Sequence, residues 1–154
     1  MSHIDIIPEA NIGSLNLAHL EAFIREILLR IGAVDWQIGL VITDNAGIKK
    51  YNRQWRKLDE PTDVLSFVQC EGEQVPAIPG MARESGDVMI SLEEIANNAG
   101  KLGIGFDDEL RRVIIHGILH LDGQDHLEND YSVGMLKMQE ELLVETRGIA
   151  IDSR

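Results

Sequence analysis

Residues 113–121 are apolar except for two histidines, and this segment is the strongest constraint on the fold. At helical spacing its apolar side chains cover every side, so a helix here has no face suited to solvent. Such a helix lies in the interior of a protein, where a buried polar side chain needs a partner. We therefore expect a buried helix over residues 107–122, in which His116 and His120 face a polar group or a metal ion.

The spacing of three histidines predicts a metal site. His116 and His120 are four residues apart, so their rings lie one turn apart on the same helix face. Gly123 can adopt the positive-φ conformation that ends a helix, and that turn can bring His126 back towards the other two rings. Three neutral imidazoles leave a tetrahedral zinc ion one open position for water, as in catalytic zinc sites. The sequence therefore predicts one Zn²⁺ ion bound by His116, His120 and His126.

Gly117 argues against one obvious zinc chemistry. The histidine spacing matches the H-E-x-x-H-x-x-G-x-x-H pattern of metzincin proteases at every position but one. Where that pattern has the glutamate that acts as general base, this chain has Gly117, which cannot accept a proton from bound water. A protease mechanism of this type is therefore disfavoured, and the same glycine would let another element pack closely on the helix.

Strand-like and helix-like segments alternate along the 154 residues. We expect strands over residues 4–8, 36–43, 64–69 and 87–91, and helices over residues 14–31, 44–58, 91–100, 107–122 and 131–146. Residues 71–86 are mostly polar, contain two prolines and three glycines, and predict a long loop. Because helices link the strands, we expect an α/β (or α+β) fold. The prediction is a single domain over residues 1–154, with a mixed sheet of about four strands and about five helices.

The charge distribution is uneven. The chain has 14 Lys and Arg against 26 Asp and Glu, a net charge of −12, which argues against coating nucleic acid or anionic lipid. Residues 49–57 nevertheless contain five cations and no acid. On a helical wheel Tyr51, Trp55 and Leu58 share a side with Ile48, opposite the cations, so we expect them to be buried. The uniform positive face predicts contact with phosphate or RNA.

The remaining features indicate a cytoplasmic protein. The only cysteine, Cys70, cannot form an internal disulfide, which fits a reducing compartment. The first residues lack the basic segment and apolar run of a signal peptide. No stretch approaches the roughly 18 apolar residues of a membrane span, so we expect no membrane association through a spanning helix.

Three blocks of the sequence resemble those of a known family. His116 to His126 resembles the H-G-x-L-H-L-x-G-x-D-H signature of the YbeY family, bacterial endoribonucleases of ribosomal RNA maturation. The segment Asn52…Trp55-Arg56…Pro61-Thr62-Asp63-Val64-Leu65-Ser66-Phe67 resembles the second block, and Gly86 to Ser91 resembles the third. The order of the blocks and the chain length also fit, so the resemblance covers most of the chain.

The resemblance implies a zinc-dependent endoribonuclease that prefers single strands. It implies action in ribosomal RNA processing, notably at the 3′ end of 16S rRNA, and in ribosome quality control, with RNA and the ribosome or ribosomal proteins as partners. It implies that His116, His120 and His126 hold the metal and that Arg56 belongs to the active cleft. The chain departs from the family at Val68, where proline is usual, and at Trp55, where tyrosine is common.

Metal-assisted phosphodiester cleavage is the mechanism we expect, with Arg56 stabilising charge on the phosphate oxygens. Asp122 and Asp125 either orient a histidine or shape the turn after the helix. One alternative is a metal-dependent hydrolase of another substrate, such as a peptide. Another is a non-catalytic ribosome-assembly factor with structural zinc, for which Cys70 would be a possible fourth ligand.

Overall fold

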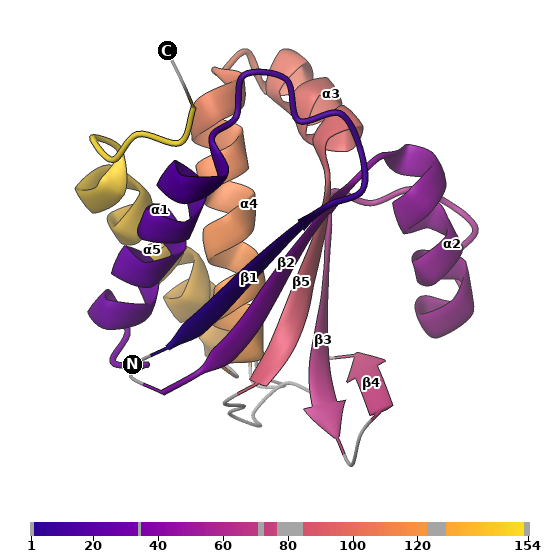
Figure 1. Ribbon diagram of the computed structural model, residues 1–154, viewed down its shortest axis with the longest axis horizontal. Helices are drawn as coiled ribbons and strands as arrows, with labels where there is room; N and C mark the ends of the chain where they lie inside the picture. Colours follow the sequence, from indigo (N-terminus) through magenta and orange to yellow (C-terminus); the bar gives the residue numbers. More distant parts are fainter. Residues whose placement is uncertain (1, 34, 71–72, 77–84, 123–128, 153–154) are drawn as a thin grey trace.

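The computed structural model describes residues 2–33, 35–70, 73–76, 85–122 and 129–152, and its five strands form one sheet (Figure 1). The strands are β1 (His3–Pro8), β2 (Gln37–Thr43), β3 (Val64–Cys70), β4 (Glu73–Pro76) and β5 (Ser85–Ser91). The helices are α1 (Leu17–Arg30), α2 (Asn45–Arg56), α3 (Leu92–Leu102), α4 (Phe106–Leu121) and α5 (Asn129–Thr146). The predicted α/β class is confirmed, and each expected helix and strand is present within a few residues of its predicted bounds.

The sheet is mixed, as expected, with the strand order β1-β2-β5-β3-β4. Strands β1, β2 and β5 run parallel, whereas β3 is antiparallel to both β5 and β4. Strand β4 is a fifth strand that lies within the segment predicted to be a loop. It pairs with the end of β3 at the edge of the sheet, where a short polar strand needs no buried face and leaves little pattern in the sequence.

Helices cover the two faces of the sheet unequally (Figure 1). Helices α1, α4 and α5 lie on one face and enclose the main core, in which α4 is the central helix. Helix α2 lies on the other face, over a small cluster formed by Ile48, Leu65, Phe67 and Met89. The prediction that α4 is buried is confirmed, since all its residues from Val113 to Leu121 are buried except the two half-buried histidines.

Local capping explains where several helices begin. Ser91 accepts a hydrogen bond from the backbone N–H of Glu94 and so caps α3, at the residue where this helix was predicted to begin. Asn16 and Asp44 cap α1 and α2 in the same way. No helix in the described part of the chain is long and apolar enough to span a membrane.

Candidate functional site

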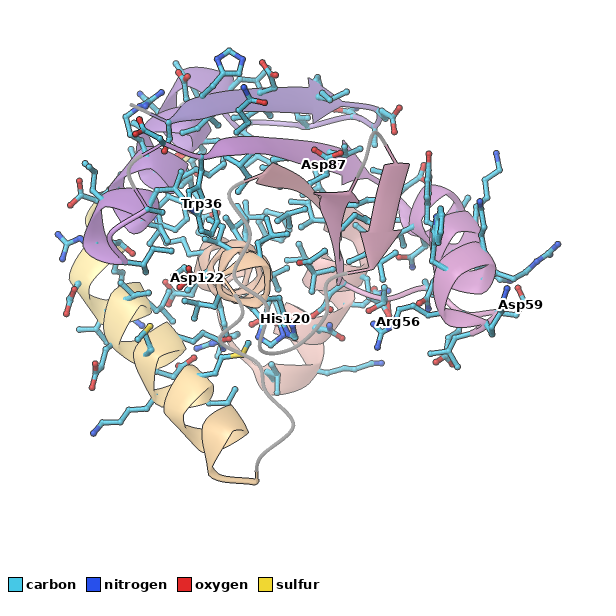
Figure 2. All side chains as sticks on the ribbon, turned by 90° about the horizontal axis from the view of Figure 1, so that it is seen from below. Trp36, Arg56, Asp59, Asp87, His120 and Asp122 are labelled. Atoms are coloured by element: carbon cyan, nitrogen blue, oxygen red, sulfur yellow. The ribbon has the colours of Figure 1, made fainter. Side chains whose placement is uncertain are left out.

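Helix α4 brings two histidine rings together near its C-terminal end, and Figure 2 labels one of them, His120. The ring centroids of His116 and His120 are 4.5 Å apart, and the ring planes are inclined by 64°. Their Nε2 atoms are 2.9 Å apart, so the same nitrogen of each ring faces the other ring. Spacing of four residues on a helix accounts for this arrangement.

This donor set fits a metal ion. Two neutral Nε2 atoms at this distance either share one hydrogen or direct their lone pairs at a common cation. Imidazole nitrogens are preferred ligands of zinc and related transition metals. Within the described residues, no group of three His, Cys, Asp or Glu side chains is placed to hold an ion. The predicted third ligand, His126, and the turn at Gly123 lie outside the described residues.

Gly117, between the two histidines, allows α4 to pack closely on the sheet. A Cβ at this position would lie 2.6 Å from Val88 Cγ1 and 3.2 Å from Val64 Cγ2, so only glycine permits this approach. The close packing expected at this glycine therefore occurs, against side chains of β5 and β3. Ser66 on β3 also donates a hydrogen bond of 3.0 Å to the Gly117 carbonyl, a contact that sequence analysis missed.

A second helix supplies a polar partner to the site. Gln139 on α5 is buried, and its Oε1 lies 2.6 Å from His116 Nδ1. Its amide nitrogen donates to Glu140, which forms two hydrogen bonds with Arg112. Hydrogen bonding from Arg112 lowers the pKa of Glu140. The contact joins residues 23 positions apart and has no local sequence pattern, so sequence analysis did not predict it.

The cationic helix α2 differs from its prediction in one respect. Ile48 and Asn52 are buried, but Tyr51, Trp55 and Leu58 are exposed, so the expectation that these three are buried was wrong. Leu58 lies beyond the end of the helix, which is at Arg56. The rings of Tyr51 and Trp55 contact Phe67 edge-on, with centroid distances of 6.3 and 6.2 Å.

Comparison with known proteins gives the family. The family described as "Endoribonuclease YbeY" matches residues 6–147, a range that contains the paired histidines, Arg56 and Gln139. The chain belongs to the YbeY family. The protein named Endoribonuclease YbeY of Treponema denticola is 41% identical over 140 residues, which cover 90% of this chain and 89% of that protein. The protein of the same name from Borreliella burgdorferi is 34% identical over 143 residues, covering 88% of this chain and 92% of that one.

A solved structure agrees with this membership of the YbeY family. The solution structure of TM1509 from Thermotoga maritima is 30% identical to this chain and matches it with a TM-score of 0.67. The match covers 94% of this chain and 89% of that protein. It therefore spans both faces of the sheet and the helix that carries the histidines.

The other predicted residues of this YbeY chain fall on different elements. Arg56 is the last residue of α2, is exposed, and forms no ion pair within the described residues. Arg56 and His120 lie apart from each other (Figure 2), on helices α2 and α4 that cover opposite faces of the sheet (Figure 1). Asp122 ends α4 and lines a surface pocket of about 310 Å³ with Arg30 and Met138 of the neighbouring helices. Asp125 and the side chain of Cys70 lie outside the described residues.

Proposed function

We propose that this chain is a zinc-dependent endoribonuclease that cleaves single-stranded regions of ribosomal RNA. The paired Nε2 atoms of His116 and His120 are the observation that supports it most strongly, in a chain that belongs to the YbeY family. The relatives carry the name Endoribonuclease YbeY. The proposal includes processing at the 3′ end of 16S rRNA and ribosome quality control in the cytoplasm, with the ribosome or its proteins as partners.

In this proposal His116, His120 and His126 hold the metal ion. A zinc ion held by these three neutral ligands would supply Lewis-acid polarisation of a phosphate oxygen and a water of lowered pKa. Arg56 binds the non-bridging oxygens of the scissile phosphate and stabilises the charge that develops on them. Its exposed guanidinium has no acidic partner within the described residues, so it is available to a phosphate.

Helix α2 supplies the binding surface in this proposal. Lys49, Lys50 and Arg53 line a pocket of about 900 Å³, together with Asp59, which lies 3.9 Å from Lys49 Nζ. In this proposal the cations contact successive phosphates. The half-exposed rings of Tyr51 and Trp55, each 36% exposed, offer faces on which unpaired bases can stack. Bases in a duplex are already stacked on each other, so this surface favours single strands.

The geometry around Gly117 bears on the peptide-hydrolase alternative. A Glu at this position would place its Cβ against Val88, so a metzincin general base has no room on this helix face. The assembly-factor alternative requires a fourth protein ligand on the metal. Metal coordination measured by X-ray absorption separates the two, because a catalytic ion retains a bound water.

The decisive test compares RNA cleavage by the zinc-loaded wild type and Arg56→Ala. We expect the variant to keep one zinc ion per chain and to lose cleavage of single-stranded RNA by about 10²–10³-fold, the usual cost of removing one charge-stabilising donor. Arg30→Ala is the matched control, because it removes an exposed guanidinium on α1, on the other face of the sheet. Equal cleavage by the wild type and Arg56→Ala, or cleavage of peptide in place of RNA, would contradict the proposal.

A further inference from the structure

We propose that Gln139 is a positioning residue that holds His116 in the tautomer with its hydrogen on Nδ1, so that Nε2 presents a lone pair to the metal. This inference rests on the proposed function, because it concerns the ion that His116 is proposed to bind. It assigns a role to a residue on α5, outside the sequence blocks that carry the family resemblance. In this part of the site, some atoms can only donate a hydrogen bond and others can only accept one.

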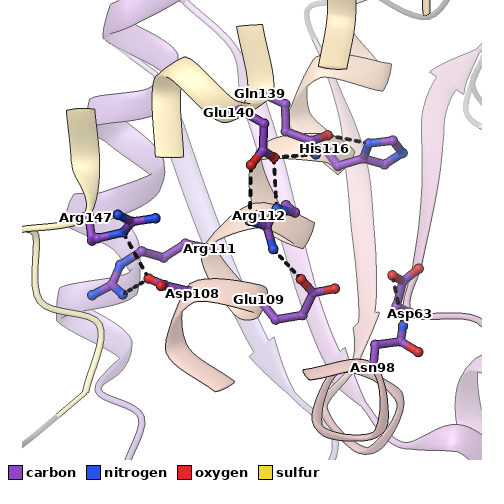
Figure 3. A network of polar contacts seen from close by, with 10 residues as sticks. All are labelled: Asp63, Asn98, Asp108, Glu109, Arg111, Arg112, His116, Gln139, Glu140 and Arg147. Atoms are coloured by element: carbon purple, nitrogen blue, oxygen red, sulfur yellow. Dashed lines mark hydrogen bonds and ion pairs between the residues drawn. The ribbon is translucent and has the colours of Figure 1, made fainter. Parts of the chain in front are cut away.

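The amide of Gln139 has one accepting and one donating end, and either can in principle face the ring. Its Oε1 lies 2.6 Å from His116 Nδ1, and its Nε2 lies 3.3 Å from Glu140 Oε2 (Figure 3). An ionised carboxylate only accepts hydrogen bonds, so the nitrogen end must be the end that faces Glu140. The oxygen end then faces His116, and because an amide oxygen only accepts, Nδ1 must carry the hydrogen.

Arg112 keeps Glu140 as an ionised carboxylate that accepts hydrogen bonds. Its Nε and one terminal nitrogen donate to the two oxygens of Glu140 at 2.9 and 3.1 Å. Its other terminal nitrogen donates at 2.8 Å to Glu109, which is buried. A guanidinium only donates, so Glu140 stays an acceptor. A series of hydrogen bonds, each with a fixed donor and a fixed acceptor, therefore runs from Glu109 through Arg112, Glu140 and Gln139 to the His116 ring (Figure 3).

This fixed tautomer has a direct consequence for metal binding. A neutral imidazole with hydrogen on Nδ1 has an unprotonated Nε2, and this is the atom that lies 2.9 Å from Nε2 of His120. The other tautomer would place a hydrogen where the ion is to bind. Metal-binding histidines in general donate their second nitrogen to a hydrogen-bond acceptor, which orients the ring and raises its basicity. Gln139 is buried at 5% exposure, so water does not readily replace it in this role.

Nuclear magnetic resonance of the metal-free protein tests the inference. The ¹⁵N chemical shifts of the His116 ring report which nitrogen carries the hydrogen, without reference to metal or RNA. We expect the Nδ1–H tautomer in the wild type and in Gln139→Glu, whose carboxylate also accepts from Nδ1. In Gln139→Leu, which has similar size but no acceptor, we expect the Nε2–H tautomer to become populated.

Zinc affinity, measured by competition with a chelator, is the second readout. We expect Gln139→Leu to bind zinc about 10–100-fold more weakly, the usual effect of losing such a partner, and Gln139→Glu to bind at least as tightly as the wild type. A purely structural role for Gln139 would not predict this rescue by glutamate. Circular dichroism of each variant checks that it is folded.

Glu140→Ala provides an independent variant that leaves both Gln139 and His116 in place. Without the carboxylate the amide can turn over, so we expect both His116 tautomers in the metal-free variant. An unchanged His116 tautomer in both Gln139→Leu and Glu140→Ala would overturn the inference while leaving the proposed function intact. Failure of the wild type to bind zinc would instead contradict the proposed function, whatever the tautomer.

Discussion

Gly117 sets how closely the helix that carries both histidines approaches the sheet. It lies directly after His116 and three residues before His120, at the point where α4 approaches β5 and β3. The missing Cβ allows that approach, and the hydrogen bond from Ser66 to the Gly117 carbonyl fixes the helix against β3. Gly117 therefore replaces the glutamate base of the protease motif and is also needed for the packing of α4 on the sheet.

Gly117→Ala should lower the free energy of unfolding by about 1–3 kcal/mol, the usual cost of overpacking a core. The added Cβ would lie 2.6 Å from Val88 Cγ1, which is closer than carbon atoms normally approach. Gly100→Ala is the matched control, because Gly100 is in α3 and a Cβ there meets nothing within 4 Å. That variant should gain about 0.5–1 kcal/mol from better helix propensity. Urea unfolding of both proteins measures the difference, and a gain in both variants would contradict the packing assignment.

Asp87 on β5 lies in register with Asp5 on β1, with Gly39 of the intervening strand β2 between them. Burial raises the pKa of Asp87 above its ordinary value of 3.8, and the charge of Asp5 raises it further. The folded protein therefore binds more protons at this group than the unfolded chain does. The contribution of Asp87 to the free energy of unfolding therefore falls as pH rises from about 3.8 to the raised pKa. At neutral pH the ionised carboxylate destabilises the fold.

Asp87→Asn should accordingly raise the free energy of unfolding at pH 7, because the neutral amide avoids both the burial cost and the repulsion by Asp5. The advantage over the wild type should shrink as pH falls through the raised pKa and disappear below about pH 3.8. Urea unfolding of both proteins from about pH 3.5 to about pH 7.5 measures this difference in the free energy of unfolding. A difference that stays constant with pH would show that Asp87 is not the titrating group.

At the scale of elements, the predictable features are those encoded locally. The histidine pair on α4 follows from spacing of four residues, and the start of α3 follows from the Ser91 cap. Strand β4 and the antiparallel direction of β3 depend on pairing between distant segments, which periodicity does not encode. The Gln139 contact joins α5 to α4 across 23 positions and was missed for the same reason.

Helix α2 shows how tertiary context changes the meaning of an amphipathic pattern. Its apolar side begins on the sheet at Ile48, whereas the rings of Tyr51 and Trp55 further along the helix meet Phe67 edge-on. Trp55 and Tyr51 are therefore half-exposed beside Arg56, on a helix that is otherwise cationic. Aromatic faces next to cations are the combination that binds unpaired nucleotides.

Trp55→Ala should weaken binding of a single-stranded RNA about fivefold to a hundredfold, since stacking of one base contributes about 1–3 kcal/mol. Fluorescence gives a direct readout, because the only other tryptophan, Trp36, is buried at 7% exposure. RNA should quench the emission of the wild type and leave the remaining emission of Trp55→Ala unchanged. Equal affinity of wild type and variant, or quenching that persists in the variant, would exclude a stacking role for Trp55.

At the scale of the whole molecule, charge is unevenly distributed along the chain. The net charge is −12, yet α2 and the residue after it carry five cations on one side of the sheet. Bulk charge opposes indiscriminate binding of RNA, and the local cations favour binding at one place. This cationic helix and the histidine-bearing helix α4 lie on opposite faces of the sheet (Figure 1).

Stepwise addition of zinc to the metal-depleted protein tests the central claim most directly. Cleavage of a single-stranded RNA and bound zinc are measured in the same samples, for the wild type and His120→Ala. We expect wild-type cleavage to rise in proportion to bound zinc and to level off at one ion per chain, whereas His120→Ala neither binds zinc at this site nor cleaves. Full cleavage by the metal-depleted wild type, or by His120→Ala, would contradict a metal-dependent endoribonuclease centred on these histidines.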